Sequence, residues 1–336
     1  MNIKKIGLSA LAGSLAVVSA NAVELTVTGK TEVTYVSNEG TTGNPFGMGN
    51  SIGFTGTGDV NGMTATYFAA IGDQGQASST TSETFASASL LLDMGDMGTI
   101  GFDQGVGVFG VGTIDDKMPY AYEEVNAYTG GSNGLRAAGG SNAIGYRNTY
   151  AGYQLSIEID PGHSATTGGT ADGTTAGATA TDHGFNFAIT GSPADGLSAG
   201  IGYGQEEADG DNSPADSDAK FYTAYANYAF GAATVGLQRS SANGGSTGTS
   251  SEEVLMYGIS YAVNENLSIS YGEIENEYGK GSEDVSVSVT EDTRGLGASY
   301  TMGSASIRVL TSSTDNAGGN TSADNKNTEI SLMLAF

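Results

Sequence analysis

The sequence contains no cysteine and no tryptophan, has only 5 proline residues, and carries few basic residues. Without cysteine, a disulfide scaffold is excluded. The 12 Lys and Arg residues face 37 acidic residues, and the net charge of −25 argues against nucleic acid as a partner. After residue 22 there is no run of about 18 apolar residues, which excludes a membrane-spanning helix. A transmembrane β-barrel passes this test, because its strands alternate apolar and polar residues.

The N-terminus has the three parts of a secretory signal peptide in the expected order. Lys4 and Lys5 are followed by an apolar stretch over 6–18, and Ala20-Asn21-Ala22 supplies small residues at a cleavage site. The alternative to a signal peptide is a short amphipathic helix at the N-terminus. We predict a signal peptide over 1–22 and a single mature domain over 23–336. Without the two lysines, 10 basic residues face 37 acidic residues, a mature net charge of −27.

In the mature chain, apolar and polar residues alternate with a period of two, which is typical of β-strands with one polar, hydrated face and one apolar face. In the last strand, Ile330, Leu332, Leu334 and Phe336 share one face, while Glu329, Ser331, Met333 and Ala335 share the other. A soluble β-sandwich would have to bury the polar rows of such strands in a dry core, which costs several kcal/mol per charge. A water-filled barrel leaves them hydrated.

Sixteen strands are predicted, joined alternately by short turns and long loops. The segments lie near 25–35, 50–58, 62–71, 83–92, 98–105, 143–149, 153–160, 183–190, 197–204, 219–230, 232–239, 252–262, 267–276, 291–301, 305–310 and 328–336. The Asn61-Gly62 pair is a good hairpin turn, and aromatic residues cluster beside the short turns. Alternating connections predict an all-β fold: a transmembrane antiparallel up-and-down β-barrel of about 16 strands.

Two features make the sequence resemble the Gram-negative general porins of the alphaproteobacterial type. One is the C-terminal strand 330–336, which ends in Phe336. The other is the third long connector, 106–142, with Val108-Phe109-Gly110 and residues 117–124 as its tip. The resemblance implies that this long third loop folds into the lumen and that the barrel-assembly machinery reads Phe336. It also implies a homotrimer in the outer membrane, surrounded by lipid and lipopolysaccharide.

By this resemblance, acids on the third loop and bases on the barrel wall form the pore constriction. The loop acids are Asp115, Asp116, Glu123 and Glu124, and the wall bases, inward by parity, are Lys30, Arg147 and Arg308. We expect a passive channel for ions and small polar solutes with a weak cation preference, because acids far outnumber bases. The alternative is that these charges are simply solvated and set no selectivity.

Cofactors and catalysis are not expected. The loop acids Asp209, Asp211, Asp216, Asp218, Glu283 and Asp284 could collect Ca²⁺, but they lack EF-hand spacing, and a hydrated acidic surface is the simpler interpretation. The two histidines, His163 and His183, flank one loop and show no metal-ligand pattern. We therefore predict no enzyme and no metal site.

Two other functions stay open at this point. A substrate-specific outer-membrane channel should show an aromatic ladder for sugars or many cations for phosphate, and neither is clear. A secreted glycine-rich adhesin or surface-layer protein would also be acidic and free of cysteine. Such a protein has no reason to end in an amphipathic strand closing on Phe336.

Overall fold

The computed structural model describes residues 24–38, 43–73, 85–115, 117–127, 135, 143–160, 163–164, 180–181, 184–206, 219–243, 252–279 and 289–336. The predicted signal peptide over 1–22 lies outside these residues, so its cleavage after Ala22 stays a prediction. Asp116 and His183 also lie outside them, as do the acids 209–218 and 283–284.

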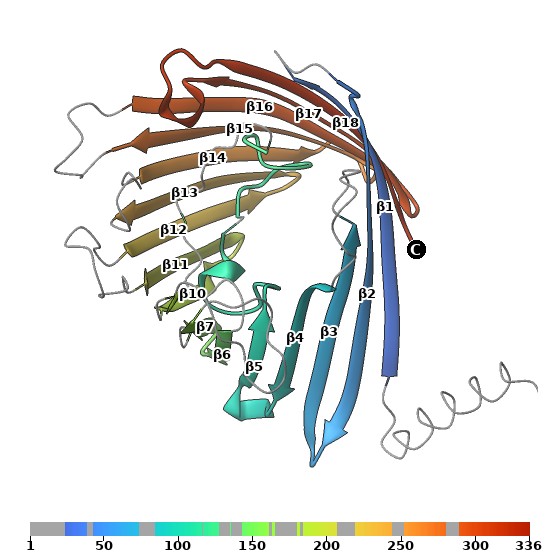
Figure 1. Ribbon diagram of the computed structural model, residues 1–336, viewed down its shortest axis with the longest axis vertical. Helices are drawn as coiled ribbons and strands as arrows, with labels where there is room; N and C mark the ends of the chain where they lie inside the picture. Colours follow the sequence, from blue (N-terminus) through green and yellow to red (C-terminus); the bar gives the residue numbers. More distant parts are fainter. Residues whose placement is uncertain are drawn as a thin grey trace, which may run out of the picture.

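Sixteen antiparallel strands close into one barrel, as predicted (Figure 1). The ring closes because β1 pairs with β2 on one side and with the last strand, β18, on the other. The strands are β1 (Glu24–Asn38), β2 (Phe46–Val60), β3 (Met63–Asp73), β4 (Phe85–Asp93), β5 (Thr99–Gln104), β6 (Ala143–Tyr150), β7 (Tyr153–Asp160), β10 (Gly184–Ala194), β11 (Leu197–Glu206), β12 (Ala219–Phe230), β13 (Ala233–Asn243), β14 (Glu252–Ala262), β15 (Leu267–Tyr278), β16 (Val289–Met302), β17 (Ala305–Asp315) and β18 (Asn325–Ala335).

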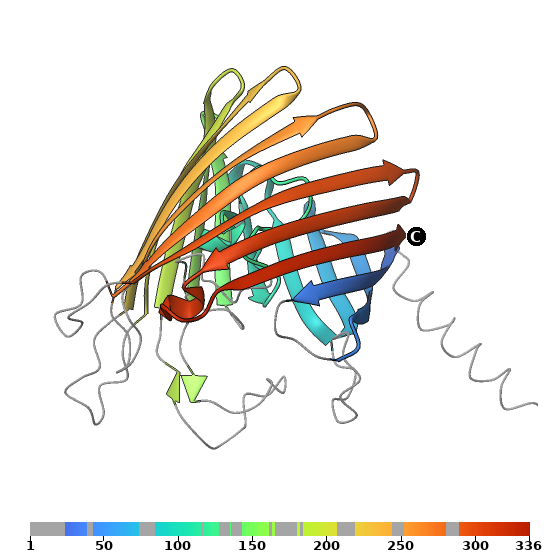
Figure 2. The same ribbon diagram turned by 90° about the horizontal axis from the view of Figure 1, so that it is seen from above.

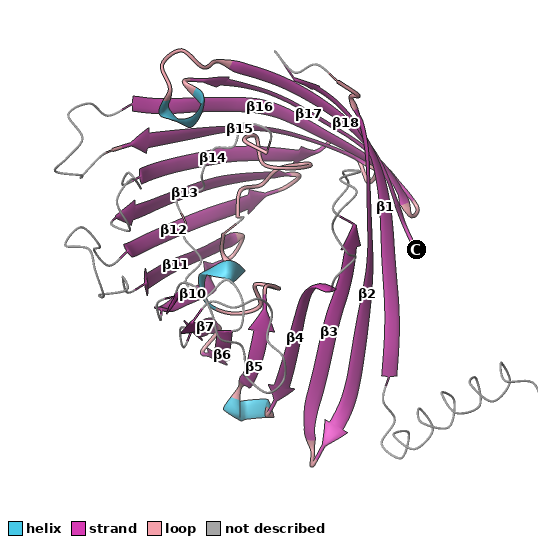
Figure 3. Cartoon of the chain, in the orientation of Figure 1, coloured by secondary structure: helices cyan, strands magenta, loops and turns pink. Residues whose placement is uncertain are grey.

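Short hairpins join the strands at one rim, and the C-terminus lies beside them (Figure 2). Asn61 and Gly62 both have positive φ, 55° and 83°, as the predicted Asn-Gly hairpin requires. Helical structure in the described part is limited to three short 3₁₀ turns, at Gly95–Met97, Gly110–Thr113 and Ala317–Gly319 (Figure 3). No helix in the described ranges is long and apolar enough to cross a membrane.

The outer face of the barrel carries most of the exposed large apolar side chains, as the period-two pattern predicts. Ile330, Leu332 and Leu334 are exposed there, while their neighbours Glu329 and Ser331 point inward and are buried. Aromatic side chains predicted to lie near the short turns are all exposed: Tyr150, Tyr153, Tyr228, Phe230, Tyr261, Tyr300 and Phe336. This belt matches the interfacial girdle of a membrane barrel.

Three details differ from the sequence-based prediction. β2 begins at Phe46, earlier than the predicted residue 50, because its glycine-rich first half carries only a weak strand signal. A two-stranded sheet of β8 (His163–Ser164) and β9 (Ala180–Thr181) forms within a connection predicted to be only a loop. The inner face is also less polar than predicted, since Phe221, Val254, Met256, Ile274 and Leu310 are buried on it.

Candidate functional site

The third long connector follows β5, and its described part, residues 105–115 and 117–127, contacts inward-facing side chains of the strands (Figure 1). Asp103, buried at the end of β5, fixes its start: the two carboxylate oxygens accept hydrogen bonds from Val106 N and Val108 N, each at 2.7 Å. Gly110 N then donates to Ser156 Oγ of β7 at 2.8 Å, and Val111 N donates to Asn186 Oδ1 of β10 at 2.8 Å. These bonds attach the first half of the connector to one side of the barrel.

The second half of the connector reaches the opposite side. Asn227 Nδ2 of β12 donates to the Lys117 carbonyl at 2.5 Å, and Ala121 N donates to Ser270 Oγ of β15 at 2.9 Å. The Tyr122 hydroxyl donates to Glu32 of β1 at 3.1 Å. One segment thus bonds to strands around most of the circumference.

Apolar side chains of the connector pack against two patches on the inner face. Val111 and Ile114 join a cluster that is completed by Ala188, Phe221, Tyr225 and Ala242 of the wall. Met118 and Val125 join a second cluster, with Val254, Met256, Ile274 and Leu310. Each fully buried side chain of this size contributes about 1.5–3 kcal/mol. The inward apolar residues therefore serve as attachment points for the connector.

Glycines on the inner face give the connector room to approach. A Cβ on Gly145 of β6 would lie 2.0 Å from the Phe109 ring, and a Cβ on Gly272 of β15 would lie 2.2 Å from the Tyr120 ring. Neither ring could keep its place beside a larger residue. Part of the high glycine content thus comes from this close packing.

A charged cluster lies where the connector meets β1, β17 and β18. Arg308 of β17 forms an ion pair with Glu32 of β1, and the two side chains are 18% and 19% exposed. Ser331 of β18 donates a hydrogen bond to the same carboxylate. The Arg308 guanidinium lies 4.4 Å from the centre of the Tyr122 ring, a cation–π contact that ties the connector to the pair.

Two more acids stand beside this pair. Burial of Glu123 raises the pKa of its carboxyl to about 7, with further increases from the charges of Glu329 and Glu32; hydrogen bonding from Tyr122 and the charge of Arg308 act in the opposite direction. Glu329 is 1% exposed, and neither of its carboxylate oxygens has a hydrogen-bond partner. Three acids thus surround one base.

The remaining predicted site residues occupy different surroundings. Asp115 is exposed, Asp116 lies outside the described residues, and the Glu124 carbonyl accepts a hydrogen bond from Ala127 N. Lys30 is inward on β1 and exposed. Arg147 of β6 lies 5.8 Å from the centre of the Phe109 ring and donates to the Val108 carbonyl at 3.4 Å. Among the predicted site residues that the structure describes, Glu123 and Arg308 lie in one cluster.

Sequence reasoning missed Glu32, Glu329, Ser331 and Tyr122 as members of this cluster. Parity places Glu32, Glu329 and Ser331 on the wet face, but many other residues share that face. Phe336 lies where predicted, at the turn rim, and its backbone pairs with Gly29 at 2.8 and 2.9 Å. Its role as an assembly signal stays a prediction.

No group of three or more His, Cys, Asp or Glu side chains in the described ranges is arranged to hold a metal ion. The acids around Arg308 instead interact electrostatically with that guanidinium and with one another.

Comparison with known proteins gives a consistent picture. The profile of the family described as Gram-negative porin matches residues 7–290. No curated protein sequence matches the chain.

Solved structures share the fold at low sequence identity. OmpF of Salmonella typhi, in complex with daunomycin, has a TM-score of 0.69 at 14% identity, covering 94% of this chain and 98% of that one. The anion-selective porin of Comamonas acidovorans has a TM-score of 0.63 at 18% identity, covering 94% and 100%. The trimer form of OmpT, an outer membrane protein of Vibrio cholerae, has a TM-score of 0.64 at 12% identity, covering 94% and 100%.

Proposed function

Since this chain belongs to the family of Gram-negative porins, we propose that it forms a water-filled channel for passive diffusion of ions and small polar solutes across the outer membrane. The observation that carries this proposal is the described part of the connector, residues 105–115 and 117–127, which bonds to strands on opposite sides of a closed barrel. A bare sixteen-stranded barrel is wide enough for water, so a segment lying across it sets the size limit. Both family and fold are those of channels and not of enzymes.

The charged cluster around Arg308 acts as the narrow, selective part of the channel. The Arg308–Glu32 pair, with Glu123 and Glu329 beside it, places opposite charges close together and orders the water between them. Apolar solutes must displace this water and are disfavoured. Small polar solutes replace it with their own hydrogen bonds and pass.

The channel prefers cations weakly. Three acids against one base leave the cluster negative, and the acidic chain as a whole raises the local cation concentration at the rims. The Comamonas acidovorans porin is described as anion-selective, so the shared barrel does not decide the sign of selectivity. That sign depends on the charges at the constriction.

The mature protein assembles as a homotrimer after export and removal of residues 1–22. The trimer form of the structurally similar OmpT supports this assembly. The barrel-assembly machinery recognises the C-terminal strand ending in Phe336, and lipid and lipopolysaccharide surround the apolar outer face.

Recordings from planar bilayers test this proposal. Refolded protein should give discrete conductance steps that close in threes, and a salt gradient should give a reversal potential of the sign expected for cations. The Glu32→Gln variant should shift that potential toward anions, whereas Glu265→Gln, an exposed acid at the short-turn rim, should not. Absence of channel activity in a correctly folded barrel would refute the proposed function.

A further inference from the structure

The outer face of the wall formed by β15–β18 and β1 changes character in successive rows from the turn rim to the loop rim. Strand register defines each row. The first of these rows is apolar and contains Tyr35, Ile330, Val309, Ala298 and Ile269. The next row contains Ser37, Thr328, Thr311, Leu296 and Tyr271. Three aliphatic hydroxyls thus follow directly after hydrocarbon side chains.

Charges begin in the row after the hydroxyls. Lys326, Ser313, Arg294 and Glu273 are neighbours in this row, and Asp315, Asp292 and Glu275 form the next one. The order along the wall is therefore apolar, hydroxyl, mainly cationic, and then anionic. On β6, β7 and β10, by contrast, apolar side chains extend to the loop ends of the strands, at Ile144, Ile159 and Phe185. The ordered rows therefore distinguish this wall from the wall of β6, β7 and β10.

A groove of about 640 Å³ lies over the hydroxyl row. Leu296 and Tyr271 border its apolar side, Ser37, Thr311 and Thr328 line its length, and Arg294 and Lys326 border its charged side. A smaller pocket of about 250 Å³, lined by Glu273, Glu275, Asp292 and Asp315, shares Arg294 with the groove. A cationic site and an anionic site therefore adjoin on the same surface.

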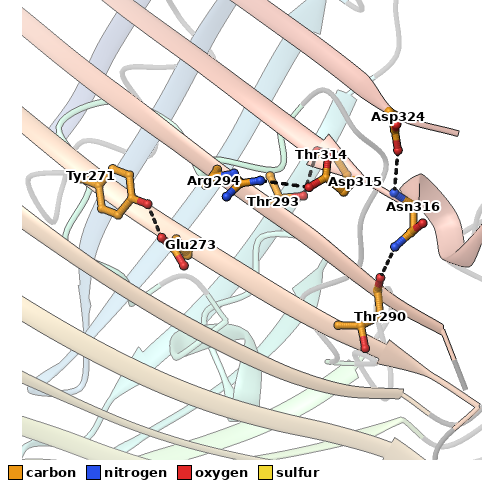
Figure 4. Close-up of polar contacts among 9 residues, drawn as sticks. All are labelled: Tyr271, Glu273, Thr290, Thr293, Arg294, Thr314, Asp315, Asn316 and Asp324. Atoms are coloured by element: carbon orange, nitrogen blue, oxygen red, sulfur yellow. Dashed lines mark hydrogen bonds and ion pairs between the residues drawn. The ribbon is translucent and has the colours of Figure 1, made fainter. Parts of the chain in front are cut away.

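Polar contacts hold the charged side chains of this surface in place (Figure 4). Arg294 Nη2 lies 2.9 Å from Asp315 Oδ2, and both side chains are about half exposed, at 57% and 47%. The Tyr271 and Tyr257 hydroxyls donate hydrogen bonds to Glu273. Arg294 donates to Asp315 through one nitrogen, and its other exposed N–H groups can donate to a second oxygen ligand.

The sequence of rows matches the layout of one kind of lipid headgroup. In a zwitterionic phospholipid, ester and glycerol oxygens follow the acyl chains, the phosphate follows the glycerol, and the ammonium group is outermost. We propose that the groove binds the headgroup of a zwitterionic phospholipid of phosphoethanolamine type. The phosphate lies against Arg294 and Lys326, and the ammonium group lies against the acids of the adjoining pocket.

An anionic phosphate alone fits this surface less well than a zwitterion. Two cations attract it, but Glu273, Glu275, Asp292 and Asp315 stand close by and repel a net negative headgroup. A headgroup that carries its own cation on the outer side converts that repulsion into attraction. Hydroxyls of the groove can donate to the phosphate and ester oxygens.

The absence of tryptophan from the chain allows a direct test, since a single introduced tryptophan reports with no background. The Leu296→Trp variant, reconstituted in vesicles of an uncharged glycolipid, is titrated with lipids that carry brominated acyl chains. Their headgroups are phosphoethanolamine, phosphoglycerol or, as the reference, that of the host glycolipid. Exposed ion pairs contribute modestly, so we expect brominated phosphoethanolamine lipid to bind roughly threefold to tenfold more strongly than brominated host lipid. Phosphoglycerol lipid should bind less strongly than phosphoethanolamine lipid.

Matched variants distinguish binding of a headgroup in this groove from unspecific contact between lipid and the barrel surface. Arg294→Gln with Lys326→Gln should remove the preference, whereas Lys220→Gln, an exposed lysine on the outer face of β12, should preserve it. A reporter at Ile201→Trp, exposed on β11, should show no headgroup preference. Native mass spectrometry of the unsubstituted protein should retain phosphoethanolamine lipid over phosphoglycerol lipid.

Equal quenching by phosphoethanolamine and host lipid would overturn the proposal, as would the same preference at both reporters. Tighter binding of phosphoglycerol lipid would overturn the zwitterionic assignment. The assay requires a folded barrel in a bilayer but no conduction. Its failure is therefore distinguishable from failure of the channel recordings.

Discussion

Acidification should weaken cation preference through a single connector residue, Glu123. Burial and the charges of Glu329 and Glu32 raise the pKa of its carboxyl to about 7. Below that pH the group is neutral, and above it the group is negative. About nine-tenths of the channels therefore carry this charge at pH 8 and about one-tenth at pH 6. Cation preference should fall as the pH drops between these values.

The size of the effect follows from the charge that is lost. A cation passing roughly 5 Å from a carboxylate in water gains about 0.8 kcal/mol, and screening in 0.1 M salt reduces this to roughly 0.5 kcal/mol. Loss of this energy lowers the local cation concentration about twofold and raises the local anion concentration by a similar factor. The permeability ratio should thus change severalfold.

Reversal potentials measured in a fixed salt gradient at pH 6, 7 and 8 provide the assay. Wild type alone is not diagnostic, because many other acids of the chain contribute to the cation preference. The informative quantity is the difference between wild type and Glu123→Gln, which removes the connector charge. Asp115→Asn, on the same connector but exposed, provides the matched control.

Wild type and Asp115→Asn should show the same pH dependence, and Glu123→Gln should show a smaller one at a cation preference that is already low at pH 8. An unchanged pH dependence in Glu123→Gln would refute the reasoning. So would a cation preference that rises as the pH falls.

Other measurements test the packing and the assembly. Gly145→Ala places a methyl group in the Phe109 ring, so conductance should change and the connector should become easier to cleave by protease, whereas Gly56→Ala, which meets open space, should behave as wild type. Arg308→Gln should raise cation preference and lower the free energy of unfolding by about 1–3 kcal/mol, because the largely buried Glu32 carboxylate loses its ion-pair partner; an unchanged reversal potential would contradict this. Phe336→Ser should reduce the yield of folded barrel severalfold on heat-modifiable gels, and Phe336→Tyr should restore it. Chelators should leave the unfolding temperature of the barrel unchanged.

The barrel was predictable from the sequence because the features that determine its strands and turns are local in the chain. Alternation with period two assigns Ile330 and Leu332 to one face and Ser331 to the other, and positive-φ residues such as Asn61 and Gly62 mark the turn between β2 and β3. Alternating short and long connections then require neighbouring strands to pair. None of these steps needs a contact between distant parts of the chain.

The site was predictable only in part, because its contacts join distant residues. Glu32 and Arg308 are 276 positions apart and meet only after the barrel closes. The apolar residues Val254 and Met256 lie in the run 254–257, in which period two is hidden, so nothing local shows that their inward side chains hold the connector. In the sequence, Gly145 and Gly272 look like ordinary strand glycines. Their role is evident only from the structure, where the rings of Phe109 and Tyr120 occupy the space beside them.

The pairing of Glu32 with Arg308 and Ser331 has a consequence for biogenesis. The first strand supplies the acid, and the last two strands supply its partners, so a partly inserted sheet cannot form the pair. The Tyr122 contact with Glu32 and Arg308 also depends on that late event. Barrels halted before closure would therefore keep the contacts of the connector with β7, β10, β12 and β15 but lack its contact with the Glu32–Arg308 pair.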